Sequence, residues 1–221
     1  MKHIFDEPRT RRYLETWAGK EAPMCLAAFF FWNSGTPEQK SQIGFLRAIL
    51  FQVLEQHPDL IPITFPDLWA EMYLKALASK AVVSPQSWTL RRCILALGAL
   101  LRQTAIPLKL CLLIDGLDEL EGGYEGDHEE LAELFKNISR SNTTNVKICV
   151  SSRPWVVFRD SFKEFPTLQL EDLTYGDIEL YVTDKFNSSS AFQRLLRQEP
   201  KSGPNLVHEI VVRAQGVFLW V

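Results

Sequence analysis

Three runs of nearly uninterrupted apolar residues stand out in this 221-residue chain. They span Met24–Phe31 (MCLAAFFF), Leu108–Ile114 (LKLCLLI) and Val146–Ser151 (VKICVS). Such runs are typical of strands that are buried on both faces of a sheet. The shorter stretch Thr167–Leu170 predicts a fourth strand.

The segments between these runs carry apolar residues three or four positions apart, which predicts helices. Residues 3–17 predict an amphipathic helix whose start has no capping residue. Thr36-Pro-Glu-Gln39 has the form of a capping box with proline at the first helical position, so a helix is expected from there to Pro58. Further helices are expected over residues 67–79, 84–103, 127–139 and 154–163, and over three stretches between Thr174 and Val221.

Apolar strands that alternate with helices argue for an α/β fold with a mostly parallel sheet flanked by helices on both faces. The chain is long enough for one sizeable α/β domain and a small helical appendage. We therefore expect a core domain over residues 1–172 and a helical extension over residues 173–221.

Charge and composition restrict the classes of partner and the compartment. The net charge of −3 gives no electrostatic footprint for nucleic acid, and the basic cluster RTRR at residues 9–12 is explained equally well as a solvated helix face. The four cysteines are far apart and three lie in apolar runs, which favours buried reduced thiols. The N-terminus lacks a signal-peptide pattern, and the longest apolar run is too short to span a membrane. We expect a cytoplasmic protein that binds neither nucleic acid nor membrane.

The stretch KLCLLIDGLDEL, residues 109–120, ends a buried strand on an acid, Asp115. Ligands bind at the carboxyl ends of strands in open α/β sheets, and a carboxylate there is costly unless it faces a cation or solvent. Asp115 is therefore a candidate to hold Mg²⁺ through water, with the metal bridging nucleotide phosphates. Asp118 and Glu119 follow closely, and either could orient an attacking water. The alternative is a capped strand followed by an acidic turn.

Polar residues also follow the third apolar run, in VKICVSSRPW. If the two strands are neighbours, Ser151, Ser152 and Arg153 lie beside Asp115. A guanidinium there could contact a γ-phosphate, because its planar donors match phosphate oxygens. The alternative is an ion pair between Arg153 and an acid of the 118–121 turn.

LLIDGLDE, a helix and then ICVSSRP resemble the NACHT branch of the signalling P-loop NTPases, the STAND class. The resemblance is greatest to NACHT proteins of filamentous fungi with a nephrocystin-like ATPase core. The stretches FFFWNSGT (29–36), LEDLTYGDIELYV (170–182) and AQGVFLWV (214–221) also fit that family. The resemblance implies a P-loop NTPase-type sheet, with Mg²⁺ and ATP or ADP as the ligands of the intact parent protein.

The resemblance also implies a role for each polar residue at the two strand ends. Asp115 corresponds to the Mg²⁺-coordinating acid of the Walker B motif, and Asp118 and Glu119 to the acidic pair that serves catalysis. Arg153 corresponds to the sensor arginine. Apart from the resemblance, we expect Ser152, from its place beside Asp115, to contact the nucleotide.

Two departures from related ATPases weaken the expected chemistry. Gly116 stands where many of them have a glutamate, so hydrolysis should be slow, as suits a switch. The phosphate-binding loop Gly-x-x-x-x-Gly-Lys-Ser/Thr does not occur in the sequence. By the resemblance, MKHIFDEPRTR matches the helix after that loop, so we expect a fragment that lacks the first strand and the loop, and also the winged-helix region beyond Val221. Alone, it should bind ATP weakly or not at all.

Two interpretations of function remain open. In the first, the chain is part of an ATP-dependent signalling switch whose partners are the other domains of its parent and, on activation, further copies of itself. In the second, it is a catalytically inactive NTPase-fold scaffold or protein-interaction module. A sugar hydrolase that uses Asp115 and Glu119 is a weak third alternative, because the sequence indicates no aromatic-lined cleft.

Overall fold

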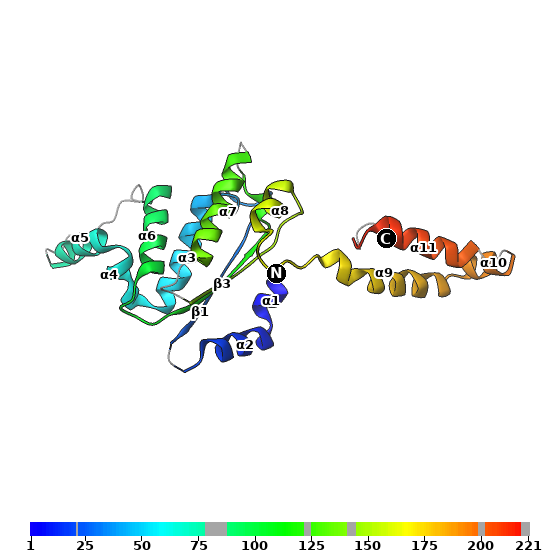
Figure 1. Cartoon of the computed structure of the whole chain (residues 1–221), viewed down its shortest axis with the longest axis horizontal. Coiled ribbons are helices and arrows are strands. Elements are labelled where there is room, and N and C mark those ends of the chain that lie inside the picture. Colours follow the sequence, from blue (N-terminus) through cyan, green and yellow to red (C-terminus); the bar gives the residue numbers. More distant parts are fainter. Residues whose placement is uncertain (21, 78–87, 122–124, 141–144, 199–201, 218–221) are drawn as a thin grey trace. The chain divides into compact units, whose positions relative to one another are not determined.

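The computed structural model describes residues 1–20, 22–77, 88–121, 125–140, 145–198 and 202–217. The chain divides into two compact units, Met1–Glu164 and Phe165–Val221 (Figure 1). The first unit is an α/β unit built on a sheet, and in its described part the second is helical.

The sheet of the first unit has three parallel strands in the order β1-β2-β3. They are β1 (Met24–Phe30), β2 (Lys109–Asp115) and β3 (Asn145–Val150), which confirms the three long apolar runs as strands. The predicted fourth strand is wrong, because residues 167–169 form no strand and Leu170 begins a helix. Leu168 and Leu170 are 68% and 64% exposed, so this stretch buries no face that a strand would need.

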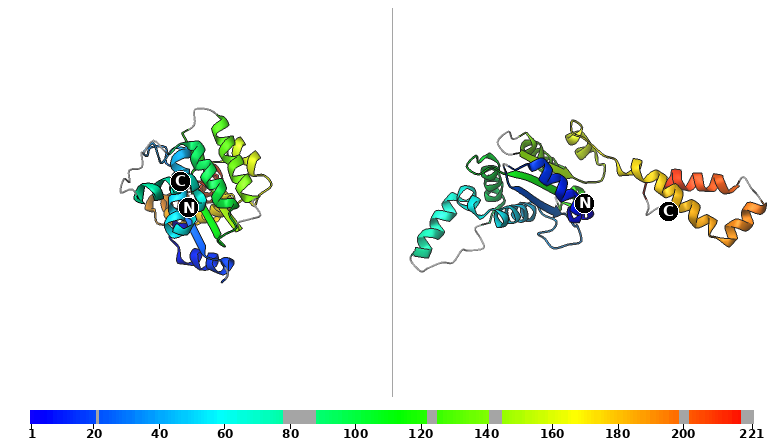
Figure 2. Two further views of the ribbon diagram at one scale, coloured as in Figure 1. Left: turned by 90° about the vertical axis from the view of Figure 1, so that its left-hand side faces the viewer. Right: turned by 90° about the horizontal axis from the view of Figure 1, so that it is seen from below.

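Helices cover one face of the sheet, and side chains from alternate positions of the strands point into that layer. The helices are α3 (Gln42–Gln56), α6 (Leu90–Arg102), α7 (Glu125–Ser139) and α8 (Val156–Phe162). Figure 1 and the left panel of Figure 2 show them on one side of the strands. The main core lies between these helices and the sheet, and its strand residues include Cys25, Ala27, Phe29, Leu110, Leu112 and Ile114.

Two short helices cover the opposite face of the sheet (Figure 1). Residues 3–17 were expected to be one helix, but they divide into α1 (Lys2–Asp6) and α2 (Pro8–Ala18). Pro8 disfavours helical backbone at Glu7, which is extended and whose carboxylate caps α2. These helices supply Met1, Phe5 and Leu14, which pack with Ala28, Cys111, Leu113 and their neighbours on the sheet.

The helix predicted from Thr36 begins later, at Gln42 of α3, with Ser41 as its cap. Thr36 and Gln39 do make one of the hydrogen bonds of a capping box, from Thr36 N–H to Gln39 Oε1 at 3.0 Å, but they close a turn. A side chain at Gly44 would place its Cβ 1.9 Å from the carbonyl oxygen of Glu38. The segment that contains Thr36–Gln39 therefore packs on the N-terminal end of α3. Its capping-box pattern predicted the helix start at the wrong position.

Other helix starts also shift from their predicted positions. Asp127 lies inside α7 and does not cap it. The predicted start at Ser84 falls outside the described residues, and α6 is capped by Thr89. Short helical elements between α3 and α6 are η1 (Pro58–Leu60), α4 (Ile61–Thr64) and α5 (Pro66–Leu77).

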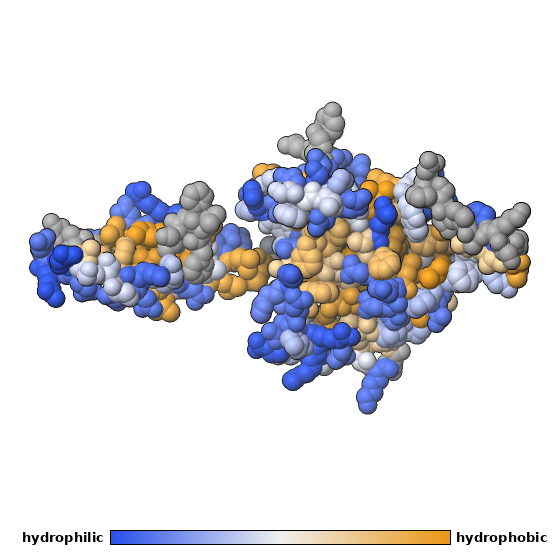
Figure 3. All heavy atoms as spheres, turned by 180° about the vertical axis from the view of Figure 1, so that it is seen from behind, coloured by the Kyte–Doolittle hydropathy of each residue, from blue (hydrophilic) through white to orange (hydrophobic). Residues whose placement is uncertain are grey.

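The second unit contains α9 (Leu170–Asn187), α10 (Ser190–Gln198) and α11 (Ser202–Ala214). Thr174, predicted to open a helix, lies within α9 and donates through Oγ1 to the carbonyl of Gly216 at 2.6 Å. Figure 3 shows apolar residues along the middle of this unit and polar residues outside them. Its small core consists of Ile178, Val182, Val211 and Ala214.

Glutamine side chains occupy the outer edge of β1, where no further strand pairs within the described residues. Gln52 of α3 accepts from Ala28 N–H at 3.0 Å and donates to Ala28 C=O at 2.9 Å. Gln56, one turn later, donates to the carbonyl of Leu26 at 3.1 Å. The amide of Gln52 thus makes the two hydrogen bonds that the backbone of another strand would make.

We predict that Gln52→Leu destabilises the first unit by about 1–3 kcal/mol, because it leaves the N–H and C=O of Ala28 without partners. Urea denaturation of the whole chain, followed by tryptophan fluorescence, measures this loss. Glu55→Gln, an exposed change on the same helix, is the control and should alter stability by less than about 0.5 kcal/mol. Equal effects of the two substitutions would contradict the role assigned to Gln52.

The cysteines should differ in reactivity according to their burial. Burial raises the pKa of Cys25 to about 12 and that of Cys111 to about 11, so both remain protonated thiols at pH 8. Burial raises the pKa of Cys93 as well, whereas the exposed Cys149 is accessible although its pKa is also raised. A disulfide reagent at pH 8 should therefore modify Cys149 first in the folded chain. Cys149→Ser should abolish this first phase, and its persistence would show that another thiol is accessible.

Candidate functional site

The carboxyl ends of the three strands meet along one edge of the sheet. Phe30 of β1 pairs with Asp115 of β2, and Ile114 pairs with Val150 of β3. The expectation that the second and third strands are neighbours is therefore confirmed. The segments that leave β2 and β3 begin side by side, and we call this edge the rim.

Ser151 holds the carboxylate of Asp115 at the rim. The Ser151 hydroxyl donates to Asp115 Oδ1 and accepts from Gly116 N–H at 3.2 Å. The backbone of Ser151 extends the pairing of the strands, since its N–H bonds Ile114 C=O at 2.9 Å and its C=O accepts from Leu117 N–H at 3.0 Å. The second oxygen, Oδ2, lies 3.8 Å from the amino group of Met1, and the Asp115 side chain is 37% exposed.

Gly116 turns the chain sharply after β2. Its φ of 73° is left-handed, and a Cβ there would lie 3.2 Å from the carbonyl oxygen of Phe31. The turn leads into the 3₁₀-helix η3 (Leu117–Glu119), which buries Leu117 completely. Glycine for the turn and leucine as the anchor explain the order of residues in DGLDE.

Asp118 and Arg153 form an ion pair across the rim. Arg153 Nε lies 3.3 Å from Asp118 Oδ2, and the backbone N–H of Arg153 donates to Asp118 Oδ1 at 3.0 Å. The carboxylate is nearly buried, with 7% of the side chain exposed, whereas the Arg153 side chain is 74% exposed. The sequence predicted this ion pair, between Arg153 and an acid of the 118–121 turn, as the alternative to a phosphate contact. Ser152, which lies between Ser151 and Arg153 in the chain, is exposed.

Glu119 connects the rim to the segment after β1. Its Oε2 accepts a hydrogen bond from the backbone N–H of Asn33 at 2.9 Å. The sequence favours a packing role for Trp32-Asn33 over a contact with the site, so Asn33 is not among the predicted site residues. The available signal was its position three residues after the end of a parallel strand, at the edge where the other polar residues gather.

The rim supplies one carboxylate that a divalent cation could approach, Asp115. The described residues contain no group of three or more His, Cys, Asp or Glu side chains that could hold a metal ion. This arrangement suits Mg²⁺, which is commonly bound through one or two carboxylates, water and the phosphates of a substrate.

These features define an α/β protein with polar residues gathered at the carboxyl edge of a small parallel sheet. A family model described as "Nephrocystin 3, N-terminal" matches residues 3–153, well over half of the chain. The chain therefore belongs to the nephrocystin-3 N-terminal family, one of the NACHT/STAND NTPase-like groups. Searches of curated proteins and of solved structures found no match. Among the described residues, no helix has the length and apolar character needed to cross a membrane.

The two partners of the rim ion pair should contribute unequally to stability. Asp118→Ala removes a nearly buried carboxylate and leaves the backbone N–H of Arg153 without its charged acceptor, so we predict a loss of about 1–3 kcal/mol. Arg153→Ala removes only an exposed guanidinium and should cost about 0–1 kcal/mol. Urea denaturation of both variants measures the difference. Equal losses would show that the side-chain ion pair, and not the bond to the Arg153 N–H, carries the interaction.

Proposed function

We propose that the rim is the magnesium and nucleotide side of an ATP-dependent signalling switch of the NACHT type. One observation carries the proposal: neighbouring parallel strands bring Asp115 and Arg153 to the same edge of the sheet. An acid for the cation and a guanidinium for a phosphate are the two groups that nucleoside triphosphate recognition requires there. The family assignment supports the same class of protein.

In this proposal Asp115 is the Walker B acid and acts through water on Mg²⁺. Asp115 would hold the ion, which would supply positive charge against the phosphates of the nucleotide. Ser151 contributes by fixing one carboxylate oxygen, and the other oxygen, which lies 3.8 Å from the amino group of Met1, is the one proposed to act on the ion. The role of Ser151 is therefore positioning, and Ser152 is the exposed residue available for a direct contact.

Arg153 is the proposed sensor of the γ-phosphate. Its backbone N–H anchors it to Asp118, while its side chain, which also pairs with Asp118, is largely exposed. Without a γ-phosphate the guanidinium pairs with Asp118, and with one it would pair with phosphate oxygens. A contact that forms only with the γ-phosphate would stabilise the ATP-bound state relative to the ADP-bound state. Such a difference is what a nucleotide switch requires.

Asp118 and Glu119 are the proposed positioning residues for an attacking water. Both have structural contacts already, Asp118 with Arg153 and Glu119 with Asn33. Release of Asp118 from the guanidinium would free a carboxylate beside the phosphate, which links hydrolysis to the switch. Gly116 replaces the glutamate of faster ATPases, so turnover in this proposal is slow.

The same contacts also favour a second candidate, a scaffold without catalysis. Two of the three rim acids hold the loops together through Arg153 and Asn33, and they could serve only this purpose. The two candidates differ in one property, which is whether Asp115 binds a metal–nucleotide complex.

Paramagnetic relaxation separates the candidates. Mn²⁺ replaces Mg²⁺ and broadens nearby amide signals even when binding is weak, because bound and free protein exchange rapidly. With millimolar Mn²⁺ and ATP, we expect the signals of Gly116 and Ser152 to broaden first, and Asp115→Asn to abolish the effect. Asp67→Asn, an exposed acid in α5, is the control and should leave it unchanged. Unbroadened rim signals, or broadening that survives Asp115→Asn, would favour the scaffold.

A further inference from the structure

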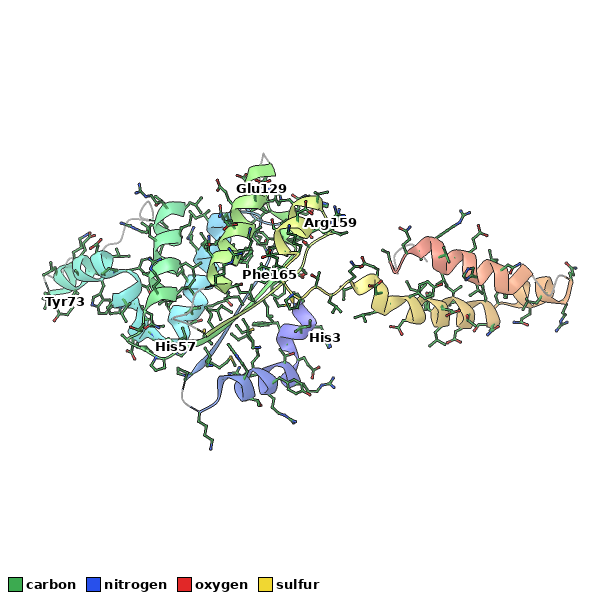
Figure 4. The ribbon with its side chains drawn as sticks, viewed as in Figure 1. His3, His57, Tyr73, Glu129, Arg159 and Phe165 are labelled. Carbon is green, nitrogen blue, oxygen red and sulfur yellow. The ribbon has the colours of Figure 1, made fainter. Side chains whose placement is uncertain are left out.

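A groove of about 1240 Å³ lies between α7, α8 and the loop after β2. Figure 4 shows Glu129 on α7 and Arg159 on α8 in this region. Its walls come from the two helices, from the segment after β3 and from Asp118 and Leu120. The volume is much larger than a metal ion or a single side chain requires.

The groove is acidic. Among the described residues, five carboxylates line it, on Asp118, Glu129, Glu130, Glu133 and Asp160, against the single cation of Lys136. Lys136 pairs with Glu133 at 2.6 Å, and Asp118 and Asp160 lie near Arg153 and Arg159. Glu129 and Glu130 are exposed and form no ion pair with any residue that the structure describes. They are the two acids that a cationic ligand could neutralise.

The carboxylates of the groove are too widely spaced for a metal. No three acidic or other metal-ligating side chains converge anywhere in the described part of the chain. A ligand for these acids must therefore carry positive charge at several separate points. Positively charged side chains along a polypeptide meet this requirement.

Trp155 gives the groove an aromatic wall. Its ring stacks on Phe158 with a centroid separation of 6.1 Å and meets the His128 ring at 5.6 Å, yet 42% of the residue stays exposed. Val156 beside it is 61% exposed. An exposed tryptophan face next to unpaired carboxylates favours a guanidinium, which can stack on the ring while it donates to the acids.

His128 supplies an unsatisfied polar atom in the same wall. The residue is only 7% exposed, and its Nε2 has no hydrogen-bond partner among the described residues. A buried nitrogen without a partner is uncommon and calls for an explanation. A neutral imidazole has one acceptor nitrogen, so an N–H donor of a ligand could satisfy it. Acid, aromatic ring and acceptor thus converge on one class of ligand.

We propose that this groove binds an arginine-bearing segment of a partner protein. Glu129 and Glu130 neutralise the guanidinium groups, Trp155 stacks on one of them, and His128 accepts a hydrogen bond from the segment. Binding in this groove requires neither Mg²⁺ nor nucleotide and is therefore independent of the proposed switch.

The test uses the whole chain and a short labelled peptide with several arginines on an alanine and leucine frame. Fluorescence anisotropy should show binding that is lost when citrulline replaces arginine. The double variant Glu129→Gln and Glu130→Gln should weaken binding about tenfold. His128→Phe keeps an aromatic ring for Trp155 and Phe158, and it should weaken binding severalfold while the folded fraction, measured by circular dichroism, stays unchanged.

A matched charge control is Glu55→Gln with Glu179→Gln. Both residues are exposed, lie on α3 and α9, and do not line the groove, so this pair should bind the peptide as the parent chain does. Equal weakening by both double variants, or equal binding of the citrulline peptide, would overturn the proposal. So would a homodimer that dissociates on Glu129→Gln, because a second copy of the chain would then occupy the groove.

Discussion

The parallel pairing of β2 with β3 is the interaction on which the candidate site depends. The register that sets Ile114 opposite Val150 releases both chains at the same edge, and Ser151 continues the pairing past the end of β3. Its hydroxyl then fixes Asp115. A register shift of one residue would reverse which face each side chain occupies, so the apolar core and the rim are specified by the same ladder.

The rim combines structural and proposed chemical roles in the same residues. Asp118 is nearly buried and receives the backbone of Arg153, whereas the guanidinium of that arginine remains largely exposed. The guanidinium of Arg153 could therefore move away from Asp118 while the backbone N–H of Arg153 keeps its hydrogen bond to the same carboxylate. Such a movement would suit the proposed switch. The backbone contact alone would be sufficient for a scaffold.

The acidic groove and the rim share Asp118 as a common wall. A cationic segment in the groove would therefore lie close to the carboxylate that holds Arg153. Electrostatic attraction to Glu129 and Glu130 would act mainly on encounter and orientation of the partner, because exposed charges contribute modestly to affinity. The ring of Trp155 and the buried His128 would provide most of the discrimination between ligands.

The sequence by itself determined the three strands, the order of the polar residues after them and the family resemblance, because long apolar runs and DGLDE are local signals. It misplaced the start of α3, since a turn at Thr36–Gln39 makes one of the hydrogen bonds of a helix cap. It also assigned a strand to Thr167–Leu170, where the structure has none. Only the tertiary structure decided that Arg153 pairs with Asp118, that Asn33 joins the rim, and that Gln52 occupies the edge of β1. Each of these contacts joins residues more than 20 positions apart, and the packing of strands and helices, which no local pattern encodes, brings them together.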